Sequence, residues 1–115
     1  MTARWHIDRT ETSLTLMRHR PARFDLSAET QLPLADMLSM AHQIRQDVWR
    51  VLQRVRGFSP VIHILRDGAG LHVLAGGRAH APIPANAPMR VQAVLNDPAN
   101  RSRWIAHANR SRGRP

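Results

Sequence analysis

Apolar residues recur with helical spacing over residues 33–57, the longest periodic stretch of the chain. Steps of three and four residues place them on one stripe of an α-helix. The stripe comprises Leu34, Met37, Ala41, Ile44, Val48, Val51 and Val55, with Leu38 and Leu52 at its sides. Pro33 suits the first position of this helix, and Gly57 suits its end. Polar residues such as Gln46 and Asp47 occupy the other side, which should face solvent.

A stripe of this length needs an apolar surface to cover it. The simplest partner is a β-sheet of the same chain. A dimeric coiled coil is the alternative, but the residues beside the stripe lack the regular charge pattern of a coiled-coil seam. Trp49 lies at the margin of the stripe, where we expect it to cover the edge of the core rather than to anchor a partner.

Two β-hairpins are predicted, one on each side of the helix. In the first, residues 5–17 alternate between apolar and polar around a turn near residues 9–11. Pairing Ile7 with Leu14 places the apolar residues of both strands on one face. The following residues 21–32 are interpreted as a connection, with an apolar anchor but no strand.

The second hairpin covers residues 61–75 and turns at the glycine-rich segment 67–70. Gly76 and Gly77 are expected to end it. Both of its faces are partly apolar, so the hairpin should lie in the centre of a sheet or be covered on both sides. Pairing or stacking between two copies of the chain would provide such cover, and we therefore expect a homodimer.

The C-terminal part combines prolines with two short helical patterns. Residues 78–88 contain three prolines and predict an extended loop. Pro88 can start a helix that runs through Leu95. Asp97 and Pro98 suit the cap and first residue of another helix through about Asn109. This last helix should bury Trp104, Ile105 and Ala108.

The predicted fold is α+β: a ββαββ antiparallel sheet with one long amphipathic helix packed on it, plus one or two short C-terminal helices. A chain of 115 residues can form one domain with one core. We assign residues 1–109 to that single α+β domain. Residues 110–115 are expected to form a disordered basic tail, because the apolar pattern ends before them.

Composition excludes several classes of protein. The chain has no cysteine, which rules out disulfides, thiolate catalysis and cysteine-ligated metals. It has no apolar run long enough to span a membrane, and its N-terminal residues lack the basic end and apolar block of a signal peptide. We therefore expect a cytoplasmic protein that does not bind membranes.

The charge is strongly positive and unevenly distributed. Seventeen arginines, with no lysine, face eight acidic residues and give a formal net charge of +9. Five of these arginines and no acidic residue lie in residues 101–115. Such a field favours a polyanionic partner. Aromatic residues between the arginines would strengthen this interpretation, but only Trp104 lies among them and it is expected in the core.

The seven histidines raise the question of a metal site. If the second hairpin turns at Gly68 and Ala69, Leu65 faces His72 and His63 faces Leu74, so the two histidines share a face. No motif supplies a third ligand, and we expect neither a metal nor a cofactor. The glycines of this turn lack the following helix of a phosphate-binding loop. No nucleophile or paired-carboxylate motif is present either, so we expect no catalysis.

Two functions remain after these exclusions. In the first, a small basic non-catalytic protein binds nucleic acid through arginine contacts to phosphates, without reading bases. The arginines expected to make these contacts are Arg45, Arg50, Arg54, Arg56, Arg101, Arg103, Arg110, Arg112 and Arg114. In the alternative, the protein is an interaction or assembly subunit of a larger complex and has no nucleic-acid role. The charge favours the first.

Overall fold

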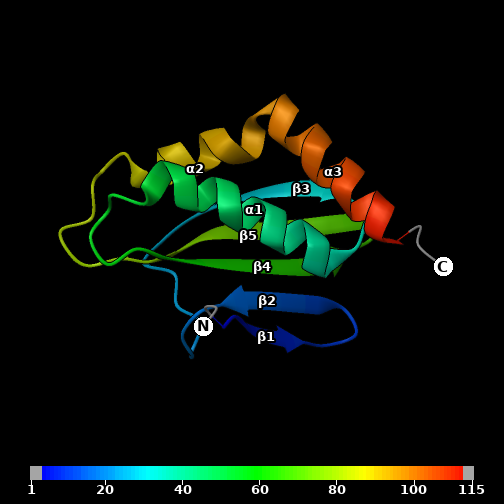
Figure 1. Cartoon of the computed structure of the whole chain (residues 1–115), viewed down its shortest axis with the longest axis horizontal. Coiled ribbons are helices and arrows are strands. Elements are labelled where there is room, and N and C mark those ends of the chain that lie inside the picture. Colours follow the sequence, from blue (N-terminus) through cyan, green and yellow to red (C-terminus); the bar gives the residue numbers. More distant parts are fainter. Residues whose placement is uncertain (1–3, 113–115) are drawn as a thin grey trace.

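The computed structural model describes residues 4–112, which form a five-stranded antiparallel sheet with three helices on the same side of it (Figure 1). The elements are β1 (His6–Arg9), β2 (Ser13–Met17), β3 (Leu26–Pro33), α1 (Met37–Leu52), β4 (Ser59–Asp67), β5 (Gly70–Arg78), α2 (Ala87–Asn96) and α3 (Pro98–Arg112). The strand order is β1-β2-β4-β5-β3. The predicted α+β class, with a long helix packed on an antiparallel sheet and two C-terminal helices, is confirmed.

The main difference from the predicted topology is the strand β3. The prediction of a strand-free connection over residues 21–32 is wrong, because β3 pairs with β5 from Leu26 to Pro33. Its residues do alternate between buried and exposed, as Ala28 and Glu29 show. The strand is nevertheless hard to recognise from sequence, because alanine and glutamate are depleted in strands and few β-branched residues mark it.

The outer edge of β3 is covered by side chains from the C-terminal helices. Gln92 of α2 donates a hydrogen bond to the Glu29 carbonyl oxygen over 3.0 Å. Arg101 of α3 donates to the Gln31 carbonyl oxygen over 2.5 Å and to Thr30 Oγ1 over 2.8 Å. These contacts satisfy edge carbonyls that would otherwise be open to pairing with another strand.

Helix α1 is shorter than the predicted helix. It begins at Met37 rather than at Pro33, because Asp36 caps it: Asp36 Oδ2 accepts a hydrogen bond from the Ser39 N–H over 2.9 Å. Pro33 instead ends β3, and α1 ends at Leu52, before Gly57. The residues of α1 that are buried in the core are Met40, Ala41, Ile44, Val48 and Leu52.

The polar side of α1 contains one buried carboxylate. The expectation that Asp47 faces solvent is wrong, because its residue exposure is only 7%. Asp47 Oδ2 accepts hydrogen bonds from Trp104 Nε1 over 2.6 Å and from Arg103 Nη2 over 2.8 Å. Helix α3 therefore packs along α1 beside the apolar stripe, and Trp104 is fully buried there, as the sequence predicts.

The two predicted hairpins form, with one change of register. Ile7 pairs with Leu16 instead of Leu14, a shift of two residues that leaves the apolar side chains on the same face. In the second hairpin, the predicted pairs His63 with Leu74 and Leu65 with His72 are confirmed.

Strand β5 does not end at the two glycines, as expected, but continues to Arg78. Gly76 and Gly77 lie between β3 and β4 at positive φ angles of 157° and 150°. A Cβ at Gly76 would overlap the Leu26 carbonyl oxygen, and one at Gly77 would overlap the Ser59 carbonyl oxygen. The glycines thus permit the close approach of three backbones instead of terminating the strand.

The C-terminal helices begin where the prolines predict. Asp97 caps α3 by accepting hydrogen bonds from the Ala99 and Asn100 N–H groups over 2.8 and 3.2 Å. This helix continues to Arg112, three residues beyond the predicted end. Residues 113–115 lie outside the described residues, so the predicted disorder of the tail stays a prediction there. Within residues 4–112, no helix is long and apolar enough to cross a membrane.

The contact between α1 and α3 gives a prediction about stability. Replacing Asp47 by alanine leaves the buried Trp104 indole N–H without an acceptor, which should lower the free energy of unfolding by about 1–3 kcal/mol. The matched control is Gln46→Ala at the exposed neighbouring position, which should change it by less than about 0.5 kcal/mol. Urea denaturation measures both. Equal stability of the two variants would contradict the role assigned to Asp47.

Candidate functional site

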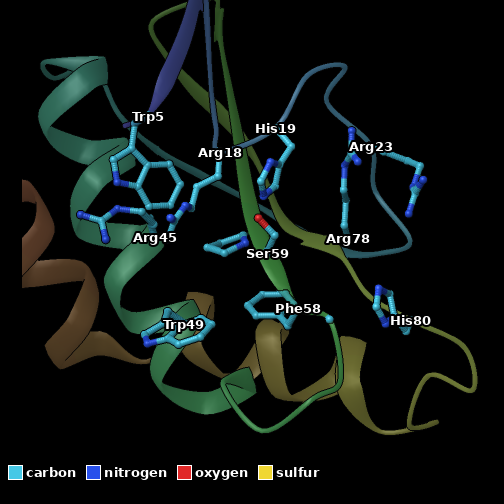
Figure 2. Close-up of a pocket in the computed structure, with 12 residues that line it drawn as sticks. Trp5, Arg18, His19, Arg23, Arg45, Trp49, Phe58, Ser59, Arg78 and His80 are labelled. Carbon is cyan, nitrogen blue, oxygen red and sulfur yellow. The ribbon is translucent and has the colours of Figure 1, made fainter. Parts of the chain in front are cut away.

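One end of the sheet carries a pocket with a volume of about 560 Å³ (Figure 2). The antiparallel order β1-β2-β4-β5 brings the starts of β1 and β4 and the ends of β2 and β5 to this end. The C-terminal half of α1 forms a further wall. The lining residues are Trp5, Arg18, His19, Arg23, Arg45, Trp49, Gly57, Phe58, Ser59, Pro60, Arg78 and His80. A pocket of this size is within the range of small-ligand sites.

Two arginines from distant segments meet on the ring of Trp5. The guanidinium carbon of Arg45 lies 4.6 Å from the ring centroid, and that of Arg18 lies 5.6 Å from it. Both distances allow cation–π attraction. Arg45 Nη2 also lies 3.3 Å from His42 Nδ1, which accepts this hydrogen bond when the imidazole is neutral. The ring of Trp5 thus holds two like charges close together.

The positive charge of these arginines is not neutralised within the pocket. Burial and the neighbouring Arg18 lower the pKa of Arg45. Among the described residues that line the pocket, none is acidic. Nearby Asp25 is already engaged, because its carboxylate accepts hydrogen bonds from Arg23 over 2.9–3.2 Å and from the Ala79 N–H over 2.9 Å. These two partners, Arg23 first, hold the pKa of Asp25 below its usual value.

A third arginine of the pocket is Arg78 at the end of β5, which forms no salt bridge within the described part of the chain but interacts with the charge of Asp25. Its Nη2 donates a hydrogen bond to the Pro21 carbonyl oxygen, which fixes the guanidinium at the pocket wall. Among residues 4–110, whose side chains the structure describes, the buried side-chain nitrogens without a hydrogen-bond partner are the Nε atoms of Arg45 and Arg78. Guanidinium groups with so few acceptors gain most from a bound anion, because hydrogen bonds between ionised groups are the strong ones.

Aromatic side chains form the wall beside these charges. Trp49 stacks on Phe58 with ring centroids 6.2 Å apart and an interplanar angle of 14°. Phe58 is buried, whereas Trp49 is 41% exposed. Gly57, next to Phe58, has a φ of +70°, and a Cβ there would overlap the His80 ring. The pocket therefore combines cationic donors with an accessible aromatic face.

The arginines predicted from sequence do not form one site. Arg45 lines the pocket, whereas Arg101 binds β3 and Arg103 binds Asp47, although the side chain of Arg103 is 46% exposed. Arg50 is 71% exposed by its side chain and lies 3.6 Å from the Asp47 carboxylate. Arg54 lies beyond the end of α1 and is exposed, and it is not among the described residues that line the pocket.

The other predicted arginines lie after the end of α1 or in the C-terminal part of the chain, in α3 and beyond it. Arg56 precedes Gly57 and is exposed, and its carbonyl oxygen accepts a hydrogen bond from the His80 N–H over 2.8 Å. Arg110 is exposed on α3, with Nη2 3.4 Å from His107 Nδ1. Arg112 belongs to α3, and Arg114 lies outside the described residues.

Most residues of the pocket were not predicted from the sequence as site residues. Trp5 and Arg18 lie at the two ends of the first hairpin, but Arg78 is far from them along the chain, and only the strand order brings it to the same end of the sheet. Trp49 was expected to cover the core edge, and it does contact Phe58, but 41% of the residue is exposed. One available signal was the cluster of arginines and histidine after β2, at residues 18–23.

His63 and His72 share the open face of the sheet, as predicted, but each has its own partner. His63 Nδ1 lies 2.8 Å from Thr15 Oγ1, and His72 Nε2 lies 2.7 Å from Glu29 Oε1. Burial, with His72 as a lesser cause, lowers the pKa of His63. Among the residues that the structure describes, no group of three or more potential ligands could hold a metal ion.

Comparison of the chain with protein-family models, curated proteins and solved structures found no match. Inferences about function therefore depend on the geometry and charge of the pocket. Its groups can bind an anion by charge and hydrogen bonding, and can stack a planar group on the accessible indole.

The charge of the pocket can be measured through His42. Burial and, second, the charge of Arg45 lower the pKa of His42 below 6.5, so an NMR titration of its imidazole should give a value under 6.5. Arg45→Gln removes the repulsion and should raise that value. Because the unfolded chain takes up the proton first, the stability contributed by neutral His42 declines as pH falls below about 6.5.

The matched control is Arg50→Gln on the exposed side of α1, which should leave the His42 titration unchanged. A wild-type value at or above 6.5, or equal values in wild type and Arg45→Gln, would contradict the electrostatic description of the pocket.

Proposed function

We propose that this protein is a non-catalytic nucleic-acid-binding protein that holds phosphate groups in the pocket at the end of the sheet. The observation that carries the proposal is the convergence of Arg18, Arg45 and Arg78 on one aromatic-lined pocket that has no acidic residue among its described lining residues. Guanidinium groups match phosphate oxygens in charge and in hydrogen-bond geometry.

Nucleic acid suits this pocket better than an isolated small anion does. The whole chain has a formal net charge of +9, which attracts a polyanion over distances longer than the pocket itself. Exposed arginines beyond the pocket, such as Arg54 and Arg56, add to this field. An isolated anion would make no use of the accessible indole of Trp49, whereas a nucleotide carries both a phosphate and a planar base.

A binding role is proposed rather than catalysis because of the groups that the wall supplies. They are cations, hydrogen-bond donors and aromatic rings. The described lining residues include no carboxylate that could orient a histidine or act as a general base. A cytoplasmic location, expected from the sequence, is part of this proposal.

A protein partner is the second candidate, and the open face of the sheet favours it. Leu65 is 39% exposed there, and Leu74 is half-buried beside the two histidines. This face lies away from the helices and could pair with a partner or with a second copy of the chain. The homodimer expected from the sequence thus stays a prediction.

The salt dependence of binding tests the proposal. Each phosphate contact to a single strand contributes a slope of about −0.7 in a plot of log affinity against log salt, and to a duplex about −0.9. Replacing Arg18 and Arg45 together by glutamine should therefore weaken binding and flatten the slope by about 1.5. Fluorescence anisotropy with labelled oligonucleotides at several salt concentrations measures both quantities.

The matched control replaces Arg66 and Arg90 by glutamine. Both are exposed, and neither lines the pocket, so this variant loses the same net charge at other places. It should keep most of the affinity and nearly all of the slope. Equal losses in the two double variants would show that binding depends on overall charge alone. A wild-type protein with no affinity for DNA or RNA at micromolar concentration would overturn the proposal.

A further inference from the structure

The arrangement of the aromatic rings points to a specific class of nucleic acid. Trp5 already has the guanidinium groups of Arg18 and Arg45 over its ring, so this ring positions the arginines. Trp49 is different: Phe58 stacks with it, and 41% of the residue is exposed. In Figure 2, Trp49 and Phe58 lie side by side along the pocket, below Trp5 and Arg45. Trp49 is therefore the ring with surface left for a ligand.

Phe58 gives this indole a rigid support. Phe58 is only 8% exposed, and its neighbour Gly57 adopts a conformation that favours glycine, with the His80 ring against it. Trp49 also stands on α1, whose apolar stripe is buried on the sheet. The indole therefore needs little further ordering when a planar group stacks on it, and preorganisation of this kind lowers the entropic cost of binding.

A base in a duplex cannot use such a ring, because its neighbours in the helix cover both of its faces. An unpaired base offers a free face, and stacking on aromatic side chains beside a basic groove is the common mode of single-strand binding. A pocket of about 560 Å³ can hold one nucleotide or a little more, whereas paired strands would have to stay outside.

We propose that the pocket binds single-stranded nucleic acid, with an unpaired base stacked on Trp49 and adjoining phosphates held by Arg18, Arg45 and Arg78. This inference depends on the proposed function and adds the class of ligand. Base stacking is tolerant of sequence, so the pocket should accept different bases.

The test compares one oligonucleotide of about 12 nucleotides, alone and annealed to its complement, at about 0.15 M salt. DNA and RNA versions are titrated with the full-length protein and followed by anisotropy. The single strand should bind at least roughly tenfold tighter than the blunt duplex. In the same titration, the single strand should quench tryptophan fluorescence in wild type and much less in Trp49→Leu; this comparison is needed because Trp5 also lines the pocket, whereas Trp104 is fully buried.

The matched variants are Trp49→Leu and Trp49→Phe. Leucine keeps apolar cover over Phe58 but cannot stack, so single-strand affinity should fall by roughly fivefold or more. Phenylalanine retains an aromatic face and should recover most of that loss. Neither variant changes a charge, so the salt slope should be that of wild type, unlike the slope of the arginine variants. Thermal melting confirms that each variant is folded.

The possible outcomes separate this inference from the proposed function. Equal affinity for strand and duplex, with loss of both in the Arg18 and Arg45 variant, would overturn the single-strand assignment and leave nucleic-acid binding intact. A single-strand preference that Trp49→Leu leaves unchanged, without quenching in wild type, would overturn the stacking assignment. Absence of binding to every oligonucleotide would overturn both proposals.

Discussion

The buried carboxylate of Asp47 and the apolar stripe beside it together set how α1 is rotated about its axis, and the candidate site depends on that rotation. With about 100° between successive residues, Asp47 lies on one flank of the apolar stripe, and Arg45 and Trp49 lie together on the other. Asp47 binds Trp104 and Arg103 of α3, the stripe around Ile44 is buried on the sheet, and the remaining flank lines the pocket. Helix α1 thus contacts α3, the core and the candidate site.

The strand order supplies the other half of the pocket. Because β1, β2, β4 and β5 are neighbours in an antiparallel sheet, Trp5 and Arg18 of the first hairpin meet Phe58 and Arg78 of the second at one end. The nearby acidic group, Asp25, is paired with Arg23 and lies close enough to Arg78 to interact with its charge, so the carboxylate offsets the charge on that side of the pocket and leaves Arg18 and Arg45 without an acidic partner among the described residues. Like charges kept close on one aromatic ring destabilise the unliganded protein, and an anion would relieve that repulsion.

Local patterns in the sequence predict much of this fold. The stripe of α1, the cap at Asp97 and the register of His63 and His72 all depend on neighbours in the chain, and each is present in the structure. Features that depend on distant contacts were not predicted. The sequence of β3 has only a weak intrinsic preference for a strand. The strand forms because it pairs with β5 and because side chains of α2 and α3 form hydrogen bonds with its outer edge. Asp47 is a polar residue that the sequence pattern places toward solvent, and only the approach of Trp104 explains its burial.

The same difference between local patterns and distant contacts explains which residues of the candidate site could be predicted. Arg45 was identified because it belongs to a basic helix, but two other predicted arginines, Arg101 and Arg103, bind β3 and Asp47 and not the pocket. The predicted contacts of the C-terminal arginines with phosphates stay a prediction. The partners of Arg45 in the pocket come from loops and strand ends, where no local period marks them. Net charge predicted the class of partner that we propose, while the position of the site required the strand order.

The most direct test of this account is chemical-shift mapping of the backbone amides during titration with a short single-stranded oligonucleotide. If the single strand binds in the pocket, the largest shifts will gather at the end of the sheet, around residues 18–23, Arg45 to Trp49, Gly57 to Ser59 and Arg78 to His80. The amides of His63 and Leu65, whose side chains lie on the open face of the sheet, should shift little. Shifts centred on that open face or on α3, with the pocket unaffected, would contradict the account.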